Sequence, residues 1–278
     1  MNTQTITLSN SQTIRVSIKP GAPNSVPLLI MNGIGANLSL LSPFVEAMHE
    51  ANPDLEIITF DSPGVGGSST PSLPYRFSGL AKTIAQMLDY LDYGKVDVLG
   101  LSWGGFLGQQ FAHDYPHRCN KLILAATCAG VVAIPPSLKV LSVMSSPKRY
   151  TDSDFMAHVA PEIYGGAFKT NPALAAEYAQ KMVKSKGEYK TCDRGYKYQQ
   201  AAICWWSSLW FLHIIKQPTL LLRGDDDPLI NPINMQVMNS LMPNASLYTV
   251  INGGHLFLLT HLDVVVPTIV EFLNEQTR

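Results

Sequence analysis

The chain has 278 residues, of which 46% are hydrophobic and 15% are charged, and its formal net charge is −1. This length and apolar content predict one large domain, or a core with an insertion, that buries a sizeable hydrophobic core. The near-neutral charge argues against a nucleic-acid-binding protein, because such proteins are normally basic, so we expect no nucleic-acid partner.

We expect no targeting segment at the start of this sequence. The sequence Met1-Asn-Thr-Gln-Thr-Ile-Thr lacks a basic stretch followed by an apolar run, so we expect no signal peptide. No later apolar run reaches the roughly 18 residues that a transmembrane helix needs. Cys119, Cys128, Cys192 and Cys204 are sparse and lack metal-ligand spacing, which favours free thiols over disulfides. We therefore expect a cytoplasmic protein with no transmembrane segment.

The first predicted elements are strands. Thr5–Ser9 and Thr13–Ile18 form a hairpin pattern, and residues 27–31 form a buried strand that leads into the glycine-containing loop 32–37. A glycine-containing loop after a buried strand brings backbone N–H groups close to a ligand. In acyl-transfer enzymes of this layout, such a loop supplies one of two donors to the oxyanion. The backbone N–H of Ile34 is the predicted donor.

The next stretch alternates helix and strand. We expect a helix over 42–50, a buried strand over 55–60 and a second helix over 75–93. Between the strand and the second helix, residues 61–69 are too rich in glycine and serine for regular structure. A phosphate-binding loop is excluded there, because the G-x-x-x-x-G-K-[ST] pattern and its lysine are missing.

The stretch from Val96 to Phe111 contains the candidate nucleophile. Val96–Leu101 is short and apolar, as a buried parallel strand should be, and a helix is expected over 106–113. Between them lies the G-x-S-x-G sequence of residues 100–104. A serine at so tight a strand-to-helix turn needs small neighbours, and the turn exposes its hydroxyl. We therefore predict Ser102 as the nucleophile and the N–H of Trp103 as the second oxyanion donor.

The alternation breaks in the middle of the chain and resumes near its end. The expected elements after the nucleophile are the strand 119–126, then, after the break, the strand 218–222, the helix 235–241, the strand 246–251 and the helix 264–275. This pattern predicts an α/β protein with a mostly parallel central sheet and helices on both faces. We assign residues 1–130 and 214–278 to the core and 131–213 to an inserted helical cap over the carboxyl edge of the sheet.

The predicted cap contains a run of large aromatic residues. Trp205, Trp206, Trp210 and Phe211 lie within seven positions of one another. Such residues pack a cap onto a core, and they also line apolar substrate pockets. Both alternatives stay open, and the four residues are candidates for the substrate pocket.

A serine nucleophile needs a base and an orienting acid. His255 follows the last predicted strand, so its loop lies at the same sheet edge as Ser102 and makes it the candidate base. The acid is expected between serine and histidine in chain order, and Asp225, Asp226 and Asp227 all follow the strand 218–222. Three consecutive carboxylates also suit a hard cation, but the spacing of a calcium loop is missing. Spacing alone does not decide among the three aspartates.

The order of these motifs resembles that of the α/β-hydrolase superfamily. In that superfamily the third residue after the glycine of the acid loop is usually the triad acid, and this resemblance assigns the role to Asp227. The likeness narrows to the intracellular poly(3-hydroxyalkanoate) depolymerases that act on medium-chain-length polyester. It rests on residues 27–38, 64–71, 88–94, 102–105, 110–116 and 254–258, where Asn32 replaces the more usual histidine. The sequence departs from the pattern at Asn231-Pro232 and at the double glycine before His255.

The resemblance implies an ester hydrolase that releases 3-hydroxy acids or oligomers from stored polyester, with no metal or organic cofactor, and that can associate with the surface of polyhydroxyalkanoate granules. Two other hydrolase hypotheses remain, a general carboxylesterase or lipase for small esters and a carbon–carbon bond hydrolase. A non-enzymatic alternative is a granule-associated or ligand-binding protein. An intact serine, histidine and acid set argues against that alternative, because binding alone does not require it.

Overall fold

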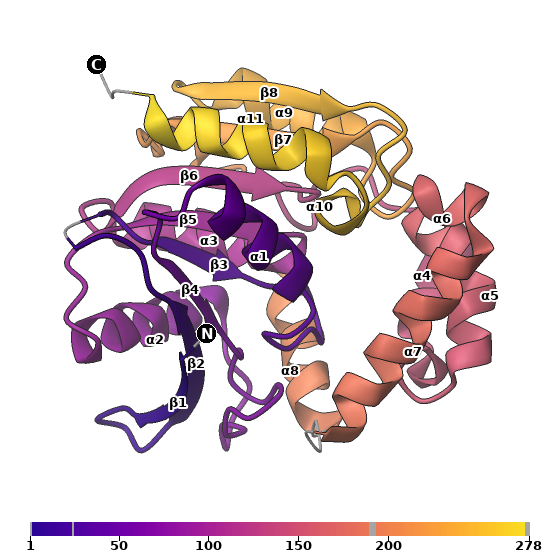
Figure 1. Cartoon of the computed structure of the whole chain (residues 1–278), viewed down its shortest axis with the longest axis horizontal. Coiled ribbons are helices and arrows are strands. Elements are labelled where there is room, and N and C mark those ends of the chain that lie inside the picture. Colours follow the sequence, from indigo (N-terminus) through magenta and orange to yellow (C-terminus); the bar gives the residue numbers. More distant parts are fainter. Residues whose placement is uncertain (1, 24, 189–192, 276–278) are drawn as a thin grey trace.

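The computed structural model describes residues 2–23, 25–188 and 193–275. Within these residues, eight strands form one sheet in the order β1-β2-β4-β3-β5-β6-β7-β8 (Figure 1). The strands are β1 (Asn2–Thr7), β2 (Thr13–Lys19), β3 (Leu28–Met31), β4 (Ile57–Phe60), β5 (Val96–Leu101), β6 (Cys119–Ala125), β7 (Thr219–Gly224) and β8 (Ala245–Val250). Strand β2 is antiparallel to β1 and to β4, and every other pairing in the sheet is parallel. The predicted mostly parallel α/β sheet is confirmed.

Burial follows from the position of each strand in the sheet. Every residue of β3, β4 and β5 is buried, as expected for central parallel strands whose two faces are both covered. The side chains of β3 show the two-residue period directly. Leu28 and Ile30 belong to one hydrophobic cluster, and Leu29 and Met31 belong to the other. The sheet therefore separates two hydrophobic cores.

Helices cover both faces of the sheet. The cluster that contains Leu28 and Ile30 also contains side chains of α1 (Ser42–Ala51) and α11 (Leu262–Asn274), which contact each other in front of the sheet (Figure 1). The opposite cluster contains side chains of α2, α3 and α9. These three helices are α2 (Phe77–Tyr90), α3 (Trp103–Asp114) and α9 (Pro232–Leu241). Their buried stripes supply the apolar surface that the central strands need.

The chain between β6 and β7, here called the helical insert, contains helices and no strand among its described residues. Its elements are α4 (Leu138–Ser145), η1 (Pro147–Tyr150), α5 (Ser153–Tyr164), α6 (Ala167–Thr170), α7 (Pro172–Glu188), α8 (Asp193–Ile203) and η2 (Leu212–Ile214). Polar caps start two of the helices, because Ser137 accepts from the N–H of Val140 and Asp152 accepts from that of Phe155. Helices α4 to α7 stand beyond the end of the sheet toward which β6 and β8 point (Figure 1).

The described cysteines are free thiols, and the described helices fall short of the requirements of a membrane span. Cys119 and Cys128 are buried free thiols and Cys204 is an exposed one, whereas Cys192 lies outside the described residues. In the ranges that the structure describes, no helix has both the length and the apolar character needed to cross a bilayer.

Candidate active site

Ser102 lies at a strained turn between β5 and α3. Its φ of 54° and ψ of −115° place it in a backbone region that residues other than glycine rarely adopt. A Cβ on Gly100 would lie 2.5 Å from the carbonyl oxygen of Gly104, and a Cβ on Gly104 would lie 2.0 Å from that of Met31. The two glycines of the G-x-S-x-G motif are therefore required by close backbone approach, and the turn projects Ser102 beyond the end of β5.

Ser102, His255 and Asp227 form one hydrogen-bonded relay. The Oγ of Ser102 lies 3.0 Å from Nε2 of His255, and Nδ1 of His255 lies 2.9 Å from Oδ2 of Asp227. His255 is only 3% exposed, and Asp227 is only 6% exposed. With its proton on Nδ1 facing the carboxylate, the imidazole presents the Nε2 lone pair to the serine hydroxyl. This arrangement can remove the hydroxyl proton as the oxygen attacks a carbonyl carbon.

The three consecutive aspartates have different surroundings. Asp227 accepts the N–H groups of Leu229 and Ile230 through Oδ1, which leaves Oδ2 for His255. Asp226 turns toward the helical insert, where it pairs with Lys169, and Asp225 is exposed. Because the carboxylates point in different directions, they do not converge on a cation. No group of three or more His, Cys, Asp or Glu side chains in the described ranges could hold a metal ion.

The segments that contain the two predicted oxyanion donors both lie close to Ser102. Trp103 follows Ser102 directly, and a Cβ on Gly33 would lie 3.8 Å from the Cβ of Ser102. Within the described residues, no hydrogen bond occupies the backbone N–H of Ile34 or of Trp103. Gln199 of α8 holds both segments in place, because its Oε1 accepts the N–H of Gly35 at 2.7 Å and its carbonyl oxygen accepts Nε1–H of Trp103 at 3.0 Å. Gln199 is fully buried, and no sequence motif had indicated this role.

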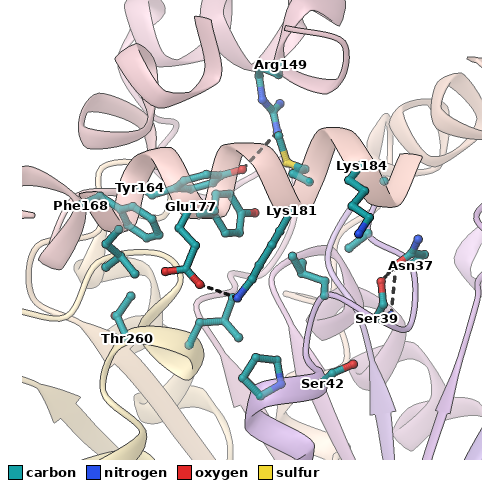
Figure 2. Close-up of a pocket in the computed structure, with 18 of the residues that line it drawn as sticks. Asn37, Ser39, Ser42, Arg149, Tyr164, Phe168, Glu177, Lys181, Lys184 and Thr260 are labelled. Carbon is teal, nitrogen blue, oxygen red and sulfur yellow. Dashed lines mark hydrogen bonds and ion pairs between the residues drawn. The ribbon is translucent and has the colours of Figure 1, made fainter. Parts of the chain in front are cut away.

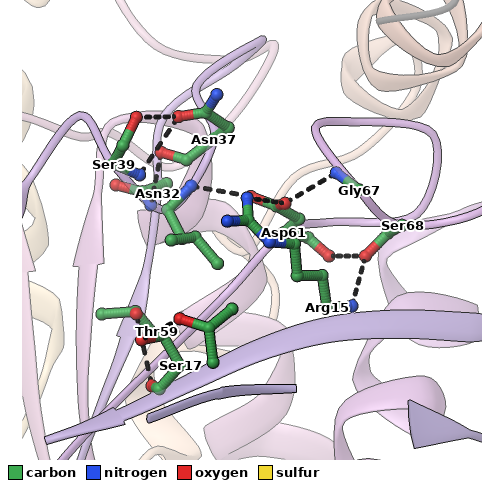
Figure 3. A network of polar contacts seen from close by, with 11 residues as sticks. Arg15, Ser17, Asn32, Asn37, Ser39, Thr59, Asp61, Gly67 and Ser68 are labelled. Atoms are coloured by element: carbon green, nitrogen blue, oxygen red, sulfur yellow. Dashed lines mark hydrogen bonds and ion pairs between the residues drawn. The ribbon is translucent and has the colours of Figure 1, made fainter. Parts of the chain in front are cut away.

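A buried polar network supports the loop that contains Ile34 (Figure 3). The carboxylate of Asp61 accepts the N–H of Leu38 at 2.7 Å and that of Gly67 at 2.8 Å, and it lies 3.4 Å from the guanidinium of Arg15. Burial raises the pKa of Asp61 against these stabilising contacts. Asn32 donates to the carbonyl oxygen of Asn37 at 3.3 Å and so spans the base of the same loop.

A cavity of about 510 Å³ lies between the Ile34 loop and the helical insert (Figure 2). Its apolar wall includes Leu40, Phe168, Leu174, Met182 and Leu259, and Lys181 and Lys184 line it as well. Tyr164 connects the cavity to the relay, since its ring also lies parallel to the imidazole of His255 at a centroid distance of 6.1 Å. The residues that line this cavity could not be identified from the sequence, because they come from segments far apart in the chain.

The aromatic residues proposed for the substrate pocket lie elsewhere. Trp206 packs against Phe77 and Phe106 of the core, with ring centroids 5.0 and 5.1 Å away. Trp205 and Trp210 are 97% and 76% exposed. Neither these three residues nor Phe211 is among the residues that line the cavity beside the relay. Trp206 thus attaches the helical insert to the core, as the packing alternative predicts.

Cys128 is poorly suited to act as a nucleophile. Cys128 is the buried thiol on the loop after β6, and burial raises its pKa to about 11. It is therefore protonated at neutral pH, whereas a nucleophilic cysteine needs the thiolate. The group hydrogen-bonded to Nε2 of His255 is the hydroxyl of Ser102.

Known proteins share this fold and much of this sequence. The model of the alpha/beta hydrolase fold family matches residues 26–156 and 140–262. A poly(3-hydroxyalkanoate) depolymerase of Ectopseudomonas oleovorans is 55% identical over 99% of this chain and 93% of its own length. Among solved structures, a hydrolase from Pseudomonas aeruginosa PA01 superposes with a TM-score of 0.80 at 22% identity, covering 99% of both chains. An esterase from Exiguobacterium antarcticum superposes with a TM-score of 0.81 at 18% identity, covering 98% of this chain and 99% of its own. The chain therefore belongs to the α/β-hydrolase fold family, in the group that includes the poly(3-hydroxyalkanoate) depolymerase of E. oleovorans.

Proposed function

We propose that this protein is a serine ester hydrolase that cleaves stored medium-chain-length poly(3-hydroxyalkanoate) through an acyl-enzyme and releases 3-hydroxy acids or oligomers. The hydrogen-bonded relay of Ser102, His255 and Asp227 carries the proposed chemistry, because no binding function needs a serine hydroxyl 3.0 Å from a buried imidazole. The likeness to the E. oleovorans depolymerase supports the choice of polyester as substrate.

The first half of the reaction forms the acyl-enzyme. The Oγ of Ser102 attacks the ester carbonyl carbon while its proton moves to Nε2 of His255, and Asp227 holds the imidazole in the required tautomer. The N–H groups of Ile34 and Trp103 donate to the oxyanion of the tetrahedral intermediate, at about 3–4 kcal/mol per donor. The carbon–oxygen bond to the alcohol then breaks, and the alcohol oxygen takes the proton from Nε2. The product of this half is an ester of Ser102.

The second half releases the acid. A water molecule attacks the acyl carbon as His255 accepts one of its protons, and the bond to Ser102 breaks with that proton returned to Oγ. The same two N–H groups stabilise the second oxyanion. Every proton thus passes through Nε2 of one imidazole, so the reaction balances without a further acid or base.

We propose residues 131–213 as a cap over this site and the adjoining cavity as the place for alkyl side chains. A volume of about 510 Å³ lies within the range of ordinary ligand sites, and the wall formed by Leu40, Phe168 and Leu259 is apolar. We further propose that the enzyme works in the cytoplasm at the surface of polyester granules. Cosedimentation of the purified protein with such granules tests the last point.

Replacement of the nucleophile tests the chemistry. We expect Ser102→Ala to lower ester hydrolysis by about 10⁶-fold, because the relay acts only through the serine oxygen. Turnover should be measured on medium-chain polyester granules, on soluble p-nitrophenyl esters and on a ring-fission dienoate. Ser142→Ala, which changes an exposed serine of α4, is the matched control and should keep the activity of the unmodified enzyme.

Each substrate separates one alternative from the proposal. Retention of full activity in Ser102→Ala would show that the mechanism is wrong. Cleavage of soluble esters without release of acid from granules would leave a general esterase, and turnover of the dienoate alone would identify a carbon–carbon bond hydrolase. If none of the three substrates is hydrolysed, the non-enzymatic alternative, a granule-associated or ligand-binding protein, would be favoured.

A further inference from the structure

The turn Tyr164-Gly165-Gly166, between α5 and α6 of the helical insert, lies directly against the loops of the proposed acid and base. The carbonyl oxygen of Tyr164 accepts the backbone N–H of His255 at 2.6 Å. The backbone N–H of Gly166 donates to Oδ2 of Asp226 at 2.8 Å, one residue before Asp227. This single turn therefore contacts both loops that complete the relay.

The contact leaves no room for side chains. A Cβ on Gly166 would lie 2.3 Å from the backbone nitrogen of Gly254, and a Cβ on Gly254 would lie 2.1 Å from the carbonyl oxygen of Tyr164. Gly165 and Gly166 also have φ values of 63° and 53°, where a side chain is strained. The glycine that precedes His255 is thus explained by the packing of the helical insert against its loop.

An ion pair holds the turn to the acid loop. Lys169, at the end of α6, pairs with Oδ1 of Asp226 while Gly166 occupies Oδ2. Partial burial works to raise the pKa of Asp226, but the Lys169 ammonium and the Gly166 N–H outweigh it and hold the pKa below its usual value. Asp226 therefore stays charged at neutral pH and keeps both contacts.

The ring of Tyr164 completes the contact. It is 4% exposed and lies nearly parallel to the imidazole of His255, at an interplanar angle of 9°. The backbone of Tyr164 thus fixes the main chain of His255, while its side chain limits the movement of the imidazole. A base held in a fixed orientation is closer to its reactive geometry, and both the hydrogen bond and the neighbouring ring favour one orientation of His255.

We propose that the Tyr164–Gly166 turn, fixed by Lys169 and Asp226, is a positioning element for His255 and Asp227, so that the relay reaches its reactive geometry only while the helical insert is docked. This inference rests on the proposed roles of Ser102, His255 and Asp227. None of the residues of the turn takes part in bond making. They act on the rate through the positions of the base and the acid.

Gly166→Ala and Lys169→Met test the proposal. A misplacement of about 1 Å at a catalytic group costs about a hundredfold in rate, so we expect that loss of kcat for Gly166→Ala on a soluble ester, with KM nearly unchanged. Lys169→Met removes a partly exposed ion pair and should lower kcat by about three- to tenfold, and Lys169→Arg should restore it. The rate at which a fluorophosphonate modifies Ser102 should fall in parallel with kcat.

Two matched variants serve as controls. A Cβ on Gly79 of α2 meets nothing within 4 Å, so Gly79→Ala should keep the kcat of the unmodified enzyme. Lys139 is an exposed lysine that pairs with Glu162 inside the helical insert at 2.9 Å, and Lys139→Met should do the same. Thermal unfolding of every variant shows whether it is folded at the assay temperature.

The outcomes distinguish positioning from a structural role. A folded Gly166→Ala protein with unchanged kcat and labelling rate would overturn the proposal, as would a lower melting temperature without loss of kcat. If Gly166→Ala does not fold, the test depends on Lys169→Met. Equal kcat values for Lys169→Met and Lys139→Met would then overturn the proposal. Full activity in Ser102→Ala would instead contradict the proposed function. Failure of the positioning proposal and failure of the proposed function can therefore be told apart.

Discussion

At the scale of single residues, side-chain direction decides which of three equivalent aspartates serves the relay. Asp227 is buried and bonded to His255, whereas Asp226 faces Lys169 and Asp225 faces solvent. Two backbone N–H groups occupy the other oxygen of Asp227 and so fix its carboxylate plane. A carboxylate held in this way keeps the imidazole proton on Nδ1 and stabilises the imidazolium as it forms.

Replacement of this carboxylate should be far more damaging than replacement of its neighbour. We expect Asp227→Asn to lower kcat by about 10⁴-fold, because the amide favours the wrong tautomer of His255. Asp225→Asn removes an exposed charge at an adjacent position and should leave kcat unchanged. Steady-state kinetics on a soluble ester measure both effects. Equal losses in the two variants would contradict the assignment of the acid.

At the scale of elements, α8 connects the two segments that hold the proposed oxyanion donors. One residue, Gln199, bonds to Gly35 through its side chain and to the Trp103 indole through its main chain. The N–H of Ile34 precedes the first contact by one residue, and the N–H of Trp103 belongs to the residue that makes the second. The spacing of the two donors therefore depends on a helix residue that lies 96 positions after Trp103 and 164 positions after Gly35 in the chain.

Removal of the Gln199 side-chain acceptor should weaken catalysis more than binding. Gln199→Leu keeps much of the side-chain volume but frees the N–H of Gly35, so the donor loop can shift. Loss of one oxyanion donor costs about 10²–10³ in kcat, and we expect a smaller fall of about tenfold for a displaced one. Gln200→Leu is the control on the same helix. A rise in KM with constant kcat would instead show that Gln199 acts in substrate binding.

At the scale of the whole molecule, Lys121 of β6 attaches the last helix to the centre of the sheet. Its Nζ donates to the carbonyl oxygens of Phe272, Leu273 and Glu275 at 2.9, 2.7 and 2.6 Å. These carbonyl groups lie at the carboxyl end of α11, where a cation also suits the helix dipole. The lysine is only 4% exposed and links the end of the described chain to a central strand.

The loss of this contact should lower the stability of the whole fold. We expect Lys121→Met to reduce the free energy of unfolding by about 1–3 kcal/mol, because hydrogen bonds of a buried cation are lost. Urea titration followed by circular dichroism measures the change, with an unaltered slope if the compactness is retained. Lys95→Met, which changes an exposed lysine just before β5, should stay within about 0.5 kcal/mol of the unmodified protein.

Much of the core could be predicted from local patterns. Strand β5 spans the predicted residues, and β4, β6, β7 and β8 differ from their predicted bounds by a few residues at the ends. The short α10 (Phe257–Thr260), directly after His255, was not predicted, because four residues are too few for a helical period to appear. The double glycine before His255 departs from the family pattern, and its cause is not local for both residues. Gly254 packs against the carbonyl oxygen of Tyr164, ninety residues earlier, whereas a Cβ on Gly253 would meet Val250.

The alternation of strands and helices and the order of serine, acid and histidine along the chain can be predicted from local patterns. These features depend on local periodicity and on motifs a few residues long, which survive without any knowledge of distant contacts. The surroundings of the relay depend instead on the tertiary fold. It brings the Tyr164–Gly166 turn against the loop of His255, Gln199 against Gly35 and Trp103, and Phe168 rather than Trp206 into the adjoining cavity. Their positions depend on how the helical insert docks on the sheet, and that docking joins residues whose separation in sequence leaves no periodic signal.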